Sequence, residues 1–180
     1  MSTLKVNSII PVAGVPTGGG GGVVQTVQHV KTDTSSFSIS SGGTHDDTNF
    51  AASITPTSTS SKILIQIMVN HGCSSNQLAA FNLMCNGSVV DAASGDASGS
   101  RARLTGAYHS EDTDKLQTVF MSFLHSPAST SQQTYNLRWR HNSGSTRTQY
   151  INRCDVDNNA SGNGMGPRAC STILLQEVSA

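Results

Sequence analysis

The chain of 180 residues carries 11 basic and 11 acidic residues, so its formal net charge at neutral pH is zero. This balance argues against a general electrostatic attraction to nucleic acid or to an anionic membrane. Serine and threonine contribute 45 residues, while glutamate occurs only as Glu111 and Glu177, a composition poor in helix formers. We therefore expect one all-β domain, long enough to bury a core without disulfide bonds.

Residues 1–22 are expected to form an extended arm that is separate from the domain at 23–180. The apolar residues of the arm are Leu4, Val6, Ile9 and Ile10. Two prolines and the glycine run 18–22 follow them, which is typical of a flexible tether. A solvated tail has no need of these apolar side chains, so we interpret the arm as a docking peptide, with a disordered tail as the alternative.

Alternating apolar and polar residues predict strands through the rest of the chain. In the strongest stretch, 61–72, Ile63, Ile65, Ile67 and Val69 form one apolar face with period two, and the other face is mixed. The mixed second faces of several strands, which include Leu64, Met68, Phe120 and Leu124, favour a homotrimer. The expected strands are 23–31, 35–40, 49–55, 61–72, 78–85, 88–90, 101–108, 115–124, 134–141, 146–153 and 170–178. Their spacing is near that of a sandwich or barrel.

The segment 134–141 places Trp139 on one face of its strand and Arg138 and Arg140 on the other. Positive charge beside an aromatic ring is a feature of nucleic-acid binding. Because the alternation separates the tryptophan from both arginines, we expect Trp139 in the core. The arginines are expected on the outer face or at a subunit interface, and no nucleic-acid partner is expected.

Loops supply the remaining candidates. Asn86-Gly87 is a strong signal for a two-residue hairpin. The densest acidic segment, 109–114, lies between two expected strands, and strict strand alternation places it at the end away from the arm, together with the turns at 86–87 and 142–144. Its candidate host-contact residues are His109, Glu111, Asp112 and Asp114.

No motif predicts an enzyme or a cofactor. The segment from Gly95 to Gly99 has its serine one place late for a G-x-S-x-G elbow. The histidine and acids at 45–47 and at 109–114 have the donor types of a metal site, but we favour solvated loops at both.

The cysteines, with no CxxC pair, are interpreted as reduced thiols rather than a disulfide or zinc site. Roughly 7–15 apolar residues would mark a signal peptide and about 20 a membrane span; neither run occurs, so we expect cytosolic synthesis.

Several stretches, taken in order, resemble virion fibre and knob proteins of tailed phages, especially marine cyanophages. The opening M-S-T-L-K-V-N-S-I with its glycine-rich tether resembles their attachment segment. The run I-T-P-T-S-T-S-S-K-I-L at 54–64 is similar to their entry into a strand. The pair Y-N-L-R-W-R and Y-I-N-R resembles their late hairpin, and S-T-I-L-L-Q-E-V at 171–178 resembles their ending.

This resemblance implies a jelly-roll-like β-sandwich, a homotrimer, mounted on a virion by its N-terminal arm after assembly in the host cytoplasm. A tail fibre or knob that contacts a host-surface glycan or protein is the first interpretation. A head fibre or capsid decoration protein of the same fold is the alternative. A carbohydrate-active sandwich enzyme ranks last, because the acids cluster in loops instead of facing each other across a cleft.

Overall fold

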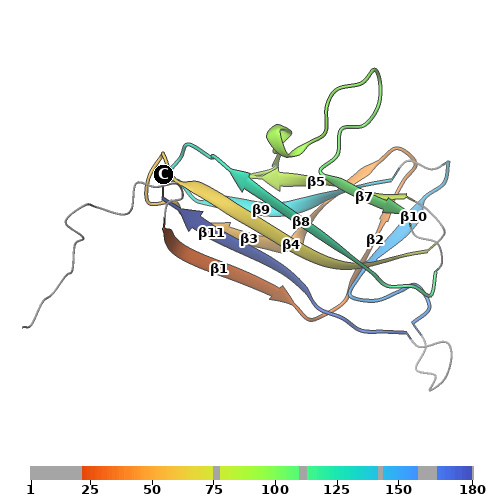
Figure 1. The fold of residues 1–180 in the computed structure, drawn as a ribbon. Helices are drawn as coiled ribbons and strands as arrows, with labels where there is room; N and C mark the ends of the chain where they lie inside the picture. The colour runs from red at the N-terminus through yellow and green to blue at the C-terminus, as the bar shows by residue number, and fades with distance from the viewer. Residues whose placement is uncertain (1–21, 75–77, 110–112, 142–143, 158–165, 180) are drawn as a thin grey trace, which may run out of the picture.

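Two antiparallel sheets stacked face to face make up the computed structural model (Figure 1). The described residues are 22–74, 78–109, 113–141, 144–157 and 166–179. In these ranges the prediction of an all-β, jelly-roll-like sandwich is confirmed, and the only helical segment is the 3₁₀ turn η1, Asp91–Ala93. Within the same ranges, no helix is long and apolar enough to cross a membrane.

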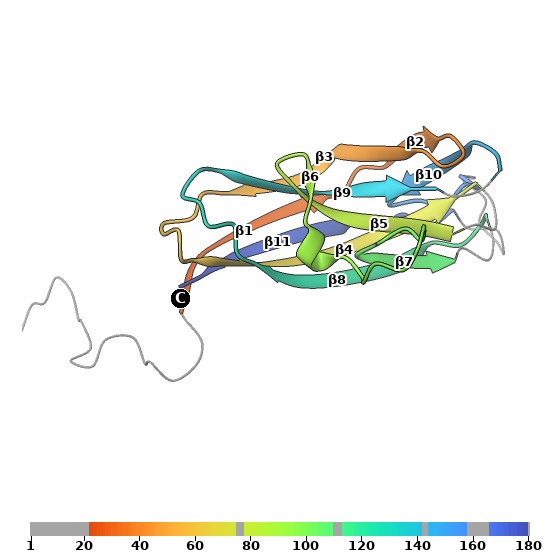
Figure 2. The ribbon, with the colours of Figure 1, turned by 90° about the horizontal axis from the view of Figure 1, so that it is seen from above.

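The larger sheet has the strand order β1-β11-β4-β10-β2, with β8 paired to the other edge of β4. Its strands are β1 (Val23–Lys31), β2 (Ser35–Ile39), β4 (Lys62–Cys73), β8 (Gln117–His125), β10 (Arg147–Ile151) and β11 (Ser171–Val178). The strands run along the long axis of the sandwich (Figure 2). The strand expected at 61–72 is therefore central, because β4 pairs with β11, β10 and β8.

The smaller sheet has the order β3-β9-β5-β6, and β7 pairs with β5 as well. Its strands are β3 (Thr44–Ile54), β5 (Leu78–Cys85), β6 (Ser88–Val89), β7 (Gly106–His109) and β9 (Gln133–Arg140). The segment between β6 and β7, which contains η1, rises from the surface of this sheet (Figure 1).

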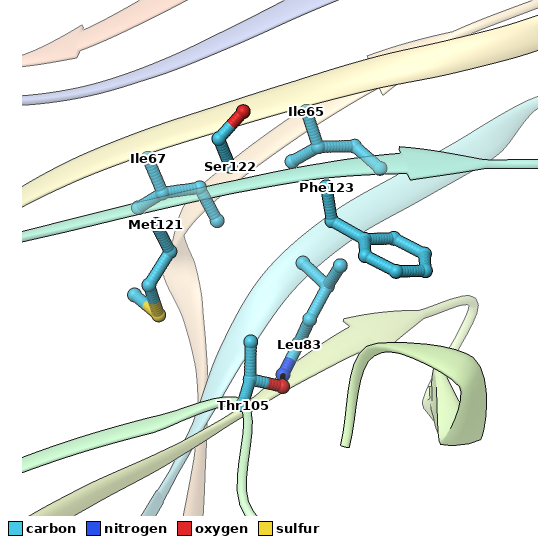
Figure 3. Close-up of a pocket in the computed structure, with 7 residues that line it drawn as sticks. All are labelled: Ile65, Ile67, Leu83, Thr105, Met121, Ser122 and Phe123. Carbon is cyan, nitrogen blue, oxygen red and sulfur yellow. Dashed lines mark hydrogen bonds between the residues drawn. The ribbon is translucent and has the colours of Figure 1, made fainter. Parts of the chain in front are cut away.

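The core lies between the sheets and is built by the predicted alternation. Ile63, Ile65 and Ile67 are buried on the inner face of β4, and Trp139 is buried on the inner face of β9, as expected. A cavity of about 10 Å³ remains among these side chains, lined by Ile65, Leu83 and neighbouring residues of β4 and β8 (Figure 3). It has room for at most one water molecule, so it is a packing gap and not a ligand pocket.

Two backbone positions explain local details that the pattern left open. Asn86 and Gly87 both have positive φ, 49° and 79°, which is the geometry of the predicted hairpin turn. Gly72 does not end its strand, since β4 continues to Cys73. A side chain at Gly72 would meet the Arg153 carbonyl oxygen at 2.5 Å, so glycine is needed for this close approach.

The ends of the sandwich correct the predicted placement of one turn. Gly22 accepts a hydrogen bond from the Ser179 amide, so the entry to β1 and the exit from β11 share one end. Asn86 bonds Thr134 at the start of β9, where β9 pairs with the last residues of β3. The 86–87 turn therefore lies toward the arm end and not away from it. The prediction was wrong because β1 and β2 run in the same direction, so strict alternation fails before β5 is reached. β6 and β7 also share a direction, which restores the count at 109–114.

Candidate functional site

The predicted site residues fall in two groups. The docking residues Leu4, Val6, Ile9 and Ile10, like Glu111 and Asp112 of the acidic loop, lie outside the described residues. His109 ends β7 and Asp114 precedes β8; both are exposed. His109 pairs with Leu78 at the start of β5. Gln117, three residues after Asp114, pairs with His71 near the end of β4. The two described members of the acidic loop therefore lie at the end away from the arm, as predicted.

The expectation of a solvated loop at 45–47 is wrong, because these residues belong to β3. His45 stacks on Phe37 with ring centroids 4.1 Å apart. Asp46 accepts two hydrogen bonds from Arg138, at 2.6 and 2.8 Å. Asp47 is buried. In the described part of the chain, no group of three histidine, cysteine or acidic side chains could hold a metal ion.

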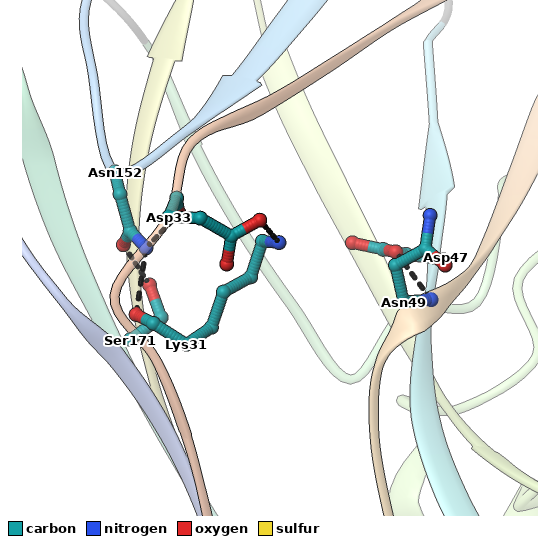
Figure 4. A network of polar contacts seen from close by, with 6 residues as sticks. All are labelled: Lys31, Asp33, Asp47, Asn49, Asn152 and Ser171. Atoms are coloured by element: carbon teal, nitrogen blue, oxygen red, sulfur yellow. Dashed lines mark hydrogen bonds and ion pairs between the residues drawn. The ribbon is translucent and has the colours of Figure 1, made fainter.

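Asp47 belongs to a polar cluster between the two sheets (Figure 4). The ammonium of the buried Lys31 donates to Asp33 at 2.9 Å, and Asp47 accepts from the Asn49 amide. Burial raises the pKa of Asp47 despite that hydrogen bond. Asn152 donates to the Lys31 and Asp33 carbonyls and so joins the β1–β2 connection to the segment after β10. The cluster fixes connections, and its exposed carboxylate, that of Asp33, is paired with Lys31.

His71 is a fully buried titratable side chain with a large pKa shift. Burial lowers the pKa of His71 to about 3, although its Nε2 lies 2.5 Å from Gln149 Oε1. Its other ring nitrogen contacts the Tyr108 hydroxyl, and burial raises the pKa of that phenol. The imidazole is therefore neutral at physiological pH and serves as a hydrogen-bonding part of the core.

The outer surface of the larger sheet forms the most extensive candidate site. The register of β1, β11, β4 and β8 places twelve outward side chains in three rows across the four strands. The first row is Thr26, Gln176, Leu64 and Leu124; the second is Gln28, Leu174, Gln66 and Ser122; the third is Val30, Thr172, Met68 and Phe120. We call these twelve residues the uncharged face, because none carries a charge. The next row contains Val23, Val178 and the charged Lys62.

Large apolar side chains of the uncharged face are open to solvent. Phe120 is 63% exposed, Leu124 is 45% exposed and Val30 is 47% exposed. Leu64 and Met68 are half-buried on the neighbouring strand. The sequence pattern assigns Leu64, Met68, Phe120 and Leu124 to the mixed second faces of their strands. Val30 and Leu174 were missed, because only the register shows that β1 and β11 extend the same surface.

The size of this surface suits a protein contact. Four strands about 4.8 Å apart, each contributing six residues at about 3.3 Å, cover roughly 400 Å² in projection. The accessible area of the side chains is larger than this projected area. A standard interface buries about 800 Å² per partner. Identical uncharged faces meet without like-charge repulsion, so a second copy of the chain is compatible with this surface.

Comparisons with known proteins give distant structural likenesses. No protein-family model matches the chain, and no curated protein matches it. The structure of infectious bursal disease virus Gt strain matches 95% of this chain and 43% of that chain, with 14% identity and a TM-score of 0.45. The crystal structure of the infectious bursal disease virus VP2 subviral particle matches 87% of this chain and 38% of that chain, with 12% identity and a TM-score of 0.38. The chain spans less than half the length of these solved chains.

Proposed function

We propose that the protein is a structural protein of a virus particle that works by self-assembly and attachment, without catalysis. The observation that carries this proposal is the uncharged face, a surface of twelve outward residues with exposed Phe120 and Leu124. Half of the twelve side chains are apolar, and exposed apolar side chains gathered on one face of a folded domain mark a site of protein contact. The sequence resemblance to phage fibre and knob proteins supports a virion as the setting.

In the proposed assembly, three copies bring their uncharged faces toward a common axis. The resemblance to trimeric fibre proteins favours three copies over two. The arm at 1–22 docks the trimer on another virion protein, and the entry to β1 at one end of the sandwich suits this role. His109, Glu111, Asp112 and Asp114 are then the candidate host-contact residues at the opposite end. A head fibre or capsid decoration protein would use the same surface.

Sedimentation of the purified protein tests the uncharged face. We expect a species of three times 18.8 kDa, about 56 kDa, at micromolar concentration. Leu124→Asp should convert it to an 18.8 kDa monomer, because three carboxylates would be buried in the interface. The fold should be retained, since Leu124 is exposed in the single chain.

Leu78→Asp is the matched control. Leu78 is 41% exposed, close to the 45% of Leu124, but it lies at the start of β5 in the smaller sheet. The Leu78→Asp substitution should leave the trimer intact. A wild-type protein that sediments only as a monomer, or equal loss of assembly in both variants, would contradict the proposal.

A further inference from the structure

A shallow cleft of about 400 Å³ lies on the outer surface of the smaller sheet. Its floor includes Asn82 of β5 and Arg140 of β9, and its wall is the segment between β6 and β7. That wall contributes Arg101 and Arg103. Three guanidinium groups from two parts of the chain thus line one cleft, in a protein whose overall charge is zero.

The wall of the cleft is held on the sheet by specific hydrogen bonds. The amide of Thr105 donates to the Phe81 carbonyl at 2.8 Å, and the Thr105 hydroxyl accepts from the Leu83 amide at 2.9 Å. The buried Asn82 side chain donates to the Arg103 carbonyl at 2.9 Å. None of these bonds uses an arginine side chain, so the wall keeps its position whatever the arginines bind.

The arginine charges are incompletely neutralised within the cleft. Arg103 is oriented by a 2.7 Å hydrogen bond to the Gly95 carbonyl, and its nearest carboxylate, Asp91, is 3.8 Å away and largely exposed. Arg101 donates to the Ser98 hydroxyl. Arg140 has no hydrogen-bond or ion-pair partner among the described residues. Three guanidinium groups against one carboxylate leave a local excess of two positive charges.

We propose that this cleft binds an anionic polysaccharide through its carboxylate or sulfate groups. The planar guanidinium forks match such groups with paired hydrogen bonds. Ser94 and Ser100 place hydroxyl groups beside the arginines, which suits the hydroxyls of a sugar. No aromatic ring lines the described cleft, so the stacking that single-stranded nucleic acid uses is missing. This inference goes beyond the proposed function and does not depend on trimer formation.

Binding of polygalacturonate oligosaccharides to the full chain tests the proposal, with their methyl esters as the uncharged counterpart. Dextran sulfate and uncharged dextran form the corresponding pair for sulfate. The two pairs of polymers therefore distinguish recognition of carboxylate from recognition of sulfate. We expect calorimetric or interferometric binding at about 0.15 M salt to at least one anionic polymer and to neither neutral one. Polyglutamate of similar charge serves as the peptide competitor and should bind more weakly.

The double variant Arg101→Gln/Arg140→Gln should weaken binding at least about tenfold, because charge-assisted hydrogen bonds are lost. Neither side chain bonds the backbone of the wall, so the melting temperature should be unchanged. Lys62→Gln/Arg168→Gln removes the same charge outside the cleft and should change affinity less than about twofold. Equal weakening by both double variants, or binding of polyglutamate as tightly as the polysaccharide, would overturn the assignment.

Discussion

Glu177 shows how a single polar residue closes one end of the sandwich. Its carboxylate is buried in β11 and accepts hydrogen bonds from Gln25 at 2.6 Å, from the Thr57 amide at 2.8 Å and from the Thr57 hydroxyl at 2.7 Å. These bonds tie β1 and the β3–β4 connection to the last strand. Burial opposes ionisation, but hydrogen bonds from Gln25, Ser61 and Thr57 lower the pKa of Glu177 to about 2.

Glu177→Gln should destabilise the fold at pH 7 by roughly 1.5–3 kcal/mol, the range for hydrogen bonds to a charged group. A carboxyl whose pKa is lowered from 4.5 to about 2 contributes stability that is complete above pH 4.5 and is lost as pH falls toward 2. The difference between wild type and variant should therefore shrink with acidification. Urea unfolding at pH 7 and pH 3.5 measures it. The control Asp96→Asn, which removes an exposed carboxylate, should leave the unfolding free energy at pH 7 unchanged. A difference between wild type and Glu177→Gln that stays constant across pH would refute the ionic role.

At the scale of elements, β4 contributes both to the core and to the uncharged face of the larger sheet. Its inner residues Ile63, Ile65 and Ile67 are buried against the smaller sheet, while Leu64 and Met68 form part of the uncharged face. A shift of one residue in register would exchange these two sets. The pairing of β4 with both β11 and β8 therefore protects the core and the candidate interface together.

Ile65→Ala should cost about 2–5 kcal/mol of unfolding free energy, because it leaves a cavity in the core between the sheets. Lys62→Ala, at the exposed start of the same strand, should cost well under 1 kcal/mol. Urea denaturation followed by tryptophan fluorescence reports both, since Trp139 is the single tryptophan and lies in the core. Equal shifts in the two midpoints would mean that the inner face is misassigned.

On the scale of the whole molecule, the two outer surfaces differ in chemistry. The larger sheet presents the uncharged face, whereas the smaller sheet presents Arg138 paired with Asp46 and the arginine cleft. The first surface suits contact with identical copies and the second suits a charged ligand. The end where β1 begins is separated from the end that bears His109 by the length of the strands. Attachment and host contact can thus occupy opposite ends.

Deleting residues 1–21 should leave the melting temperature and the sedimentation of the protein unchanged while removing it from assembled particles. Gly22 is kept in this variant because its carbonyl accepts the Ser179 hydrogen bond. Protein copy number per purified particle, measured by quantitative mass spectrometry, provides the test. Full incorporation of the truncated chain would refute docking through the arm, whereas loss of folding would show that the arm belongs to the domain.

Local sequence pattern by itself determined most of the strands and their faces, although the strand expected at 101–108 is β7 and begins only at Gly106. Period-two alternation assigned Ile65 and Trp139 to the core, and Asn86-Gly87 determined a turn that requires positive φ at both positions. Such features depend on residues close in sequence. The local pattern did not predict the polar start of β3. Asp46 lies in this strand opposite Arg138, which binds its carboxylate, and Asp47 is buried in the protein interior.

Long-range pairing decided the rest. Val30 lies beside Thr172, and Met68 lies beside Phe120, through hydrogen-bond registers that no local pattern encodes. The cleft likewise required tertiary structure, because Arg101 is brought near Arg140 by a segment that folds back over β5. The sequence determined which side chains point outward from each strand. Only the tertiary structure decided which of those side chains share a surface, since neighbours across a sheet come from distant parts of the chain.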